Sequence, residues 1–228
     1  MSTSWRGRKE PTAGELLLVN WVLVLLRGIP VAIVVFGGLI LHTVLRIFEY
    51  PFLGSRRPLT QYVTQVVCKT SLFLLGISIT VEGFPMKERG AVVANHSSWL
   101  DIFALNATQK IYFVAKSEVA NWPGIGWLAR ATGTVFIQRK ALQAHKQKNI
   151  FTERLLAGHK LLFFPEGTST DSLRVLSFKS SLFAAFFETN VPRNLFIQPV
   201  TVIYHAPMGS NPWFYGWWGE MSFGAHLV

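Results

Sequence analysis

The stretch that decides the fold is Ala91-Val-Val-Ala-Asn-His-Ser-Ser-Trp-Leu-Asp101. An apolar run, a short polar loop and a second apolar run predict a strand followed by a helix, with polar side chains presented at a sheet edge. The loop brings an imidazole, His96, and a carboxylate, Asp101, together. A carboxylate that holds one nitrogen of a histidine leaves the other free to take a proton, so this pair is a candidate general base.

The same residues have a simpler interpretation. Ser98-x-x-Asp101 matches a helix-start capping pattern, in which Asp101 accepts only a backbone N–H of the first turn. Residues five apart in a continuous helix also point in different directions. The pair can therefore work only if His96 precedes the helix and Asp101 lies in its first turn.

The composition indicates a membrane-associated protein. Of the 228 residues, 50% are hydrophobic and 15% are charged, against about 25% charged in ordinary soluble domains. The 22 Lys and Arg residues outnumber the 12 Asp and Glu residues, and the net charge of +10 favours anionic lipid surfaces or acidic substrates. The sequence contains no finger, RNP or basic-helix motif, so nucleic acid is not an expected partner.

The amino-terminal third is strongly apolar. A polar segment over residues 1–15 is followed by a predicted membrane-anchoring helical region over residues 16–75. Arg27 and Pro30 divide its apolar run, which predicts either one spanning helix kinked near Pro30 or a helix pair lying in one leaflet. Arg46, Arg56 and Arg57 would hold the chain beyond them on the cytoplasmic face, and we expect a bacterial inner-membrane protein.

Residues 76–228 alternate between short apolar runs and amphipathic ones, which predicts an α/β domain with a mostly parallel central sheet and flanking helices. The expected strands are Ile77–Val81, Ala91–Ala94, Ile111–Ala115, Thr134–Ile137, Leu161–Phe164 and Ile197–Ile203. The expected helices are Trp99–Ala107, Ile125–Ala131, Leu142–Ala157 and Leu182–Glu188.

Several of these strands end in polar groups that suit an anion and a proton transfer. Lys116 follows one strand, Arg139 follows the next, and the turn Pro165-Glu-Gly-Thr168 follows a third. Two of them have an ordinary alternative: Lys116 could be a solvated charge, and Glu166 a turn residue. Otherwise Glu166 would accept hydrogen bonds from Arg139 or from the headgroup of a bound acceptor. Arg139 and Lys140 begin a helix, an unfavourable end for cations, which favours ligand binding by Arg139.

These blocks, in this order, resemble the motifs of the PlsC-type 1-acyl-glycerol-3-phosphate acyltransferases, and the resemblance runs from about Val81 to Val202. Asn95-His96-Ser-Ser-Trp-Leu-Asp101 is similar to the family's His-x4-Asp motif, which implies that His96 is the general base and Asp101 its orienting partner. The resemblance also implies that Arg139 grips an acceptor phosphate, and that Glu166, Gly167 and Thr168 line the acceptor site. Phe178-Lys179-Ser-Ser181 departs from the family's Phe-Lys-x-Gly turn.

The resemblance implies transfer of an acyl group from acyl-CoA or acyl carrier protein to the free hydroxyl of a lysolipid, with neither metal nor organic cofactor. Lysophosphatidic acid is the default acceptor because Lys116 and Arg139 suit a phosphate. Lyso-ornithine lipid is the alternative, because a cationic pocket could equally hold its carboxylate. We expect backbone N–H groups at the start of the helix after His96 to donate hydrogen bonds to the oxyanion of the tetrahedral intermediate. A serine acyl-enzyme on Ser97 or Ser98 is the competing chemistry, without a Gly-x-Ser-x-Gly elbow to support it.

A different class of protein also fits the charge and the apolar amino terminus: a non-enzymatic basic protein that binds acidic lipids. It leaves the polar strand ends unexplained. The remaining histidines, namely His42, His145, His159, His205 and His226, are expected to be surface or satisfied core residues. Cys68, the single cysteine, excludes an intrachain disulfide and is expected to be a small buried hydrophobe.

Overall fold

The computed structural model describes residues 4–11, 18–137, 144–180, 183, 194–221 and 226. Within them the central sheet is parallel throughout, with the strand order β3-β2-β4-β1-β5. Its strands are β1 (Gly90–Ala94), β2 (Tyr112–Lys116), β3 (Val135–Ile137), β4 (Lys160–Phe163) and β5 (Phe196–Val200). The predicted α/β architecture is confirmed.

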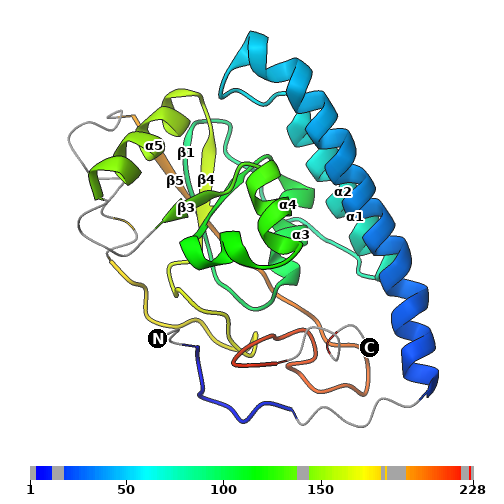
Figure 1. Cartoon of the computed structure of the whole chain (residues 1–228). Helices are drawn as coiled ribbons and strands as arrows, with labels where there is room; N and C mark the ends of the chain where they lie inside the picture. Colours follow the sequence, from blue (N-terminus) through cyan, green and yellow to red (C-terminus); the bar gives the residue numbers. More distant parts are fainter. Residues whose placement is uncertain are drawn as a thin grey trace.

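The helices are α1 (Leu18–Leu53), α2 (Thr60–Leu74), α3 (Leu100–Thr108), α4 (Ile125–Ala131) and α5 (Ala144–Leu156), with a 3-10 turn, η1, over Ser117–Asn121. Figure 1 shows α1 and α2 side by side along one side of the sheet, with α3 between them and the strands and α5 on the other side. The chain therefore forms successive layers, with the sheet inside.

Both faces of the sheet are apolar, and helices bury both of them. On one face, Ala91 and Val93 of β1 pack with Leu161 of β4 and with Phe151 and Leu155 of α5. On the other, Val92 and Ala94 pack with Leu162 and with Leu105 of α3. Burying each of the large aliphatic side chains contributes about 1.5–3 kcal/mol, which fixes the register of β1 between β4 and β5.

Two sequence predictions need correction. Ile77–Val81 forms no strand, because this apolar segment has no strand beside it to pair with among the described residues. The last strand ends at Val200 and not at Ile203. Of the two alternatives for the apolar run, the structure has the single helix, which continues through Pro30. The predicted helix Leu182–Glu188 lies, apart from residue 183, outside the described residues.

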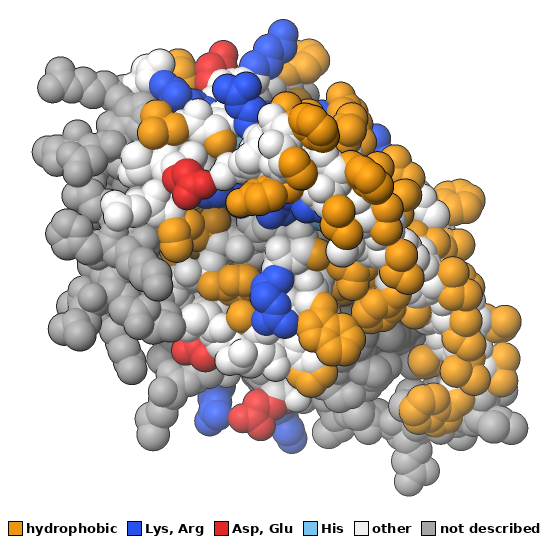
Figure 2. Space-filling view, turned by 45° about the horizontal axis from the view of Figure 1, so that its top comes forward, with side chains coloured by type: hydrophobic (Ala, Val, Ile, Leu, Met, Phe, Trp, Pro, Cys, Tyr) orange, Lys and Arg blue, Asp and Glu red, His pale blue; other side chains and the backbone are white. Residues whose placement is uncertain are grey.

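Helix α1 is long and apolar enough to cross a membrane, and it is the one such helix in the described part of the chain. Its 36 residues extend about 54 Å at 1.5 Å per residue, more than the ~30 Å of a bilayer core. Leu26, Ile33, Ile40 and Ile47, seven residues apart, are each about two-thirds exposed. Figure 2 shows the resulting band of hydrophobic side chains along this side of the molecule.

Helix α2 joins the helical side to the α/β domain. Gly38 of α1 lets the two helices approach closely, because an added Cβ would lie 2.3 Å from Cγ2 of Val67. On its other side, Cys68 and Leu72 pack against Ala107 of α3. Cys68 is buried and has no disulfide partner, as predicted.

Burial raises the pKa of the Cys68 thiol to about 12, from an ordinary value of 9.0. At pH 8 the thiolate fraction is therefore about a thousandfold below that of an exposed cysteine. We predict that a thiol reagent labels the native protein very slowly, and that denaturation releases the reactivity. Rapid labelling of the native protein at the rate of a free thiol would contradict the packing of α2 on α3.

Candidate active site

His96 and Asp101 meet at the carboxyl-terminal edge of the sheet. His96 lies in the loop after β1 and Asp101 in the first turn of α3, the arrangement that the pair requires. Nδ1 of His96 lies 2.7 Å from Oδ2 of Asp101. Because the carboxylate accepts this bond, Nδ1 carries the proton and Nε2 is the nitrogen that can act as a base.

Asp101 is fully buried and saturated with donors. Besides His96, its Oδ2 accepts the backbone N–H groups of Ser97 at 2.8 Å and Ser98 at 3.1 Å. Its Oδ1 accepts the hydroxyl of Tyr204 at 2.7 Å. The capping interpretation and the catalytic one are therefore compatible, because one carboxylate binds the loop backbone and the imidazole.

This arrangement changes one sequence expectation. The N–H groups of Ser97 and Ser98 point to Asp101, so these two donors do not serve as the oxyanion hole expected at the helix start. Both serine side chains are also buried, and Oγ of Ser97 accepts a bond from Asn95 at 3.2 Å. Neither is placed as an exposed nucleophile, which favours direct acyl transfer over a serine acyl-enzyme.

Glu166 fixes the backbone of the histidine loop. It lies in the turn after β4, is 1% exposed, and accepts the N–H of His96 through Oε1 and that of Leu176 through Oε2, each at 2.7 Å. Burial raises the pKa of Glu166, and the two backbone hydrogen bonds oppose that shift. Both carboxylate oxygens are thus engaged within the protein, and the lining of an acceptor site by Glu166 stays a prediction.

Gly167 and Thr168 complete this turn. Gly167 has a φ of +71°, and an added Cβ would lie 2.7 Å from Nζ of Lys179, so Lys179 reaches the turn although the following loop departs from the family's pattern. Oγ1 of Thr168 accepts the N–H of Trp5 at 3.3 Å. The amino-terminal segment 4–11 therefore packs beside the turn that follows β4.

Lys116 is the last residue of β2, at the same edge of the sheet. Because β4 separates β2 from β1, the strand that carries Lys116 lies about 10 Å from the strand that leads to His96. Arg139 lies outside the described residues, although β3, which precedes it, ends at this edge as well. The role of each as an acceptor ligand remains a prediction.

Three residues of the site were not identified as functional from the sequence. Tyr204 bonds to Asp101 across a sequence separation of 103 residues, and burial together with the nearby carboxylate raises its pKa. Phe164 stacks on the imidazole with ring centroids 4.0 Å apart. Asn95 binds both backbone groups of Val202, at 2.9 and 2.7 Å. No short-range sequence pattern connects these three residues with one another. The polar residues at the ends of neighbouring strands did predict a site at this edge of the sheet.

The comparisons with known proteins show the family to which the chain belongs. A family model described as Acyltransferase matches residues 78–203, the segment from just after α2 to just past β5. The chain belongs to the acyltransferase family. It is an acyltransferase enzyme, and the non-enzymatic lipid-binding class is set aside.

Individual relatives show how far the likeness extends. The chain is 52% identical to a lyso-ornithine lipid O-acyltransferase of Rhodobacter capsulatus, over 98% of this chain and 81% of that protein. It is 40% identical to a 1-acyl-sn-glycerol-3-phosphate acyltransferase of Neisseria gonorrhoeae, over 50% of this chain and 46% of that protein. The fold matches the acyltransferase PlsC from Thermotoga maritima with a TM-score of 0.54 at 23% identity, covering 81% of this chain and 83% of the other.

The bond from Tyr204 to Asp101 predicts a positioning role. Tyr204→Phe removes one hydrogen bond to a buried carboxylate, worth about 1.5–3 kcal/mol. We expect kcat to fall about tenfold or more with a small change in KM, together with a shifted pH–rate profile.

Tyr215→Phe is the matched control, because Tyr215 lies beside Tyr204, with ring centroids 5.5 Å apart, and its loss leaves the bond to Asp101 in place. If Y204F changed thermal stability alone, with kcat and the pH profile equal to those of Y215F, the positioning role would be wrong.

Proposed function

We propose that this enzyme transfers a fatty acyl group to the free hydroxyl of a lysolipid, with His96 as the general base. The observation that supports this most strongly is the 2.7 Å bond between Nδ1 of His96 and the buried Asp101. The imidazole is itself 21% exposed at the edge of the sheet, so a substrate can reach it. Phe164 covers one ring face and holds the imidazole plane.

In the proposed mechanism, Nε2 of His96 takes the proton from the lysolipid hydroxyl while that oxygen attacks the thioester carbonyl. Asp101 stabilises the imidazolium that forms. The tetrahedral intermediate then collapses, the C–S bond breaks, and the imidazolium returns its proton to the thiolate. The partial positive charge at the start of α3 favours the negative charge that develops nearby.

For the acceptor headgroup, we propose lyso-ornithine lipid, with lysophosphatidic acid as the second candidate. The relatives include lyso-ornithine lipid O-acyltransferases and 1-acyl-sn-glycerol-3-phosphate acyltransferases, and both support a lysolipid acceptor. The match to the lyso-ornithine enzyme covers nearly the whole chain, whereas the match to the Neisseria enzyme covers half of it. A carboxylate and a phosphate can both be held by Lys116 and Arg139, so the cationic strand ends fit either headgroup.

The donor is proposed to be acyl-CoA or acyl carrier protein, used as a substrate, and no metal or organic cofactor takes part in the proposed steps. We place the enzyme in a bacterial inner membrane with the site on the cytoplasmic side. The exposed apolar face of α1 supports the membrane association. Arg46, Arg56 and Arg57 near the end of α1 support the orientation.

Replacing the base tests the mechanism. His96→Ala should abolish turnover, measured as thiol release in the presence of a lysolipid, while the protein still folds and binds membrane. The expected loss is at least 10²–10⁴-fold, the contribution of general base catalysis. Substantial remaining turnover by H96A would contradict the assignment of His96.

Replacing the proposed headgroup ligand tests the acceptor site. Arg139→Ala should raise the KM for the acceptor with a smaller effect on kcat, because a headgroup contact acts mainly on binding. Lys140→Ala, which removes the neighbouring charge, is the matched control. An unchanged acceptor KM in R139A would remove Arg139 from the site.

An acceptor panel on the purified enzyme separates the two candidates. With one acyl donor, kcat/KM should be highest for lyso-ornithine lipid, measurable for lysophosphatidic acid, and lower for a zwitterionic lysophosphatidylcholine. A clear preference for lysophosphatidic acid would reverse the proposed order of acceptors without affecting His96.

A further inference from the structure

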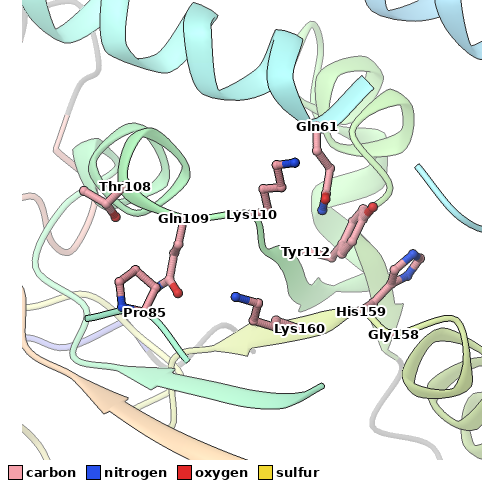
Figure 3. Close-up of a pocket in the computed structure, with 9 residues that line it drawn as sticks. All are labelled: Gln61, Pro85, Thr108, Gln109, Lys110, Tyr112, Gly158, His159 and Lys160. Carbon is pink, nitrogen blue, oxygen red and sulfur yellow. The ribbon is translucent and has the colours of Figure 1, made fainter. Parts of the chain in front are cut away.

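A polar cavity of about 280 Å³ lies at the amino-terminal edge of the sheet. Figure 3 shows the side chains that line it, contributed by α2, by the end of α3 and by the starts of β2 and β4. Lys110, Tyr112, His159 and Lys160 are its chemically distinctive residues. The amide side chains of Gln61 and Gln109 also line it.

This cavity is separate from the site of His96. Tyr112 and Lys160 begin β2 and β4, whereas His96 and Glu166 follow the ends of β1 and β4. Because these strands are parallel, the two sites occupy opposite edges, and the four residues of β4 put about 13 Å of strand between them. Nothing in the proposed acyl transfer uses the cavity.

Several buried polar atoms beside the cavity have no hydrogen-bond partner within the described part of the protein. They are the hydroxyl of Tyr112, both ring nitrogens of His159 and Oε1 of Gln109. The backbone of Ser55 acts on His159 as a weak hydrogen-bond partner outside normal geometry. Burial, followed by the charges of Arg154 and Arg57, lowers the pKa of His159 to about 3, so the ring is neutral and has one donor and one acceptor nitrogen. Leaving a buried polar group unpaired is unfavourable, so such a group requires a polar partner. His159 is thus not the satisfied core histidine expected from the sequence.

Two further arginines stand behind the cavity. The ring centroids of Tyr112 and His159 lie 4.2 Å apart. The guanidinium carbon of Arg154 lies 4.3 Å from the centroid of the Tyr112 ring. Arg57 and Arg154 converge on Gly133, donating to the carbonyls of Ala131 and Gly133, each at 2.7 Å. The Nε atoms of both arginines are also buried and have no hydrogen-bond partner among the described residues.

The charge around this edge is strongly positive. Burial, followed by the charge of Arg57, lowers the pKa of Arg154 to about 10, and burial lowers the pKa of Lys160. Three acids oppose this charge in part: Glu88 acts on Lys160, Glu49 on Arg57 and Glu153 on Arg154. Glu49 and Glu153 also accept hydrogen bonds from Thr60 and Ser55. A ligand that supplies negative charge and oxygen acceptors would satisfy these cations together with the donors of Tyr112 and His159, whereas Oε1 of Gln109 is itself an acceptor and is not satisfied by such a ligand.

The mouth of the cavity adjoins the helical side of the protein. Nζ of Lys110 lies 3.2 Å from the ring centroid of Tyr62, which is 57% exposed on α2. Val66, one turn further along α2, is 62% exposed. Aromatic and aliphatic side chains beside lysines are typical of surfaces that meet lipid headgroups.

We propose that this cavity binds an oxyanion, a phosphate or carboxylate group, of the kind carried by an anionic lipid headgroup. Lys110 and Lys160 supply the charge at the mouth, and Tyr112 and His159 supply hydrogen-bond donors inside. The site would hold the amino-terminal edge of the sheet against an acidic membrane, independently of which lysolipid the enzyme acylates.

The test compares full-length variants in two binding assays. Lys110→Gln with Lys160→Gln removes the two charges of the cavity, and Lys69→Gln with Lys87→Gln removes two charges from exposed lysines elsewhere. Gln61→Trp fills the cavity without changing the charge. One assay measures affinity for vesicles of phosphatidylcholine with and without phosphatidylglycerol. The other measures the Tm of detergent-solubilised protein with added inorganic phosphate.

We expect K110Q/K160Q and Q61W to bind phosphatidylglycerol vesicles about tenfold more weakly than K69Q/K87Q, with equal binding to phosphatidylcholine alone. A rise in Tm with phosphate that K110Q/K160Q loses, without a difference on vesicles, would assign the site to a soluble oxyanion. If both cavity variants matched K69Q/K87Q in both assays, the polar groups would bind water only and the proposal would be wrong.

Discussion

The site depends on one buried carboxylate. Asp101 accepts four hydrogen bonds, from the imidazole of His96, from two consecutive backbone N–H groups and from the hydroxyl of Tyr204. A carboxylate can be kept fully buried only when its oxygens are satisfied in this way. The same contacts shape the loop between β1 and α3, so the bond between His96 and Asp101 and the local fold stabilise each other.

The part of this arrangement that is local in sequence could be predicted. An apolar strand, a polar loop and a helix place His96 before α3 and Asp101 in its first turn, and the alternating pattern predicts the parallel sheet. The partners of the loop come from far along the chain: Glu166 follows β4, and Tyr204 lies beyond β5. Their roles arise from the strand order β4-β1-β5, which no short-range spacing reveals.

The incorrect predictions have physical causes as well. Ile77–Val81 has the apolar composition of a strand, but strand formation also needs a neighbouring strand edge. Of the two arrangements that Pro30 left open, one helix or a helix pair, the structure has one helix. His159 was expected to have its hydrogen bonds satisfied if it were buried. The topology instead buries it beside Tyr112 and Arg154, at the positively charged amino-terminal edge of the sheet. The carboxyl-terminal edge of the sheet thus holds the pair of His96 and Asp101, and the amino-terminal edge holds the cationic cavity.

The most direct test of the account is the turnover of Asp101→Asn, because asparagine has nearly the same shape but cannot stabilise the imidazolium or fix its tautomer. We expect kcat to fall by about 10³–10⁴ in a variant that still folds and binds lysolipid at the assay temperature, although its Tm falls because the buried acceptor loses its charge. Turnover within about threefold of the unmodified enzyme would contradict the view that Asp101 makes His96 a base.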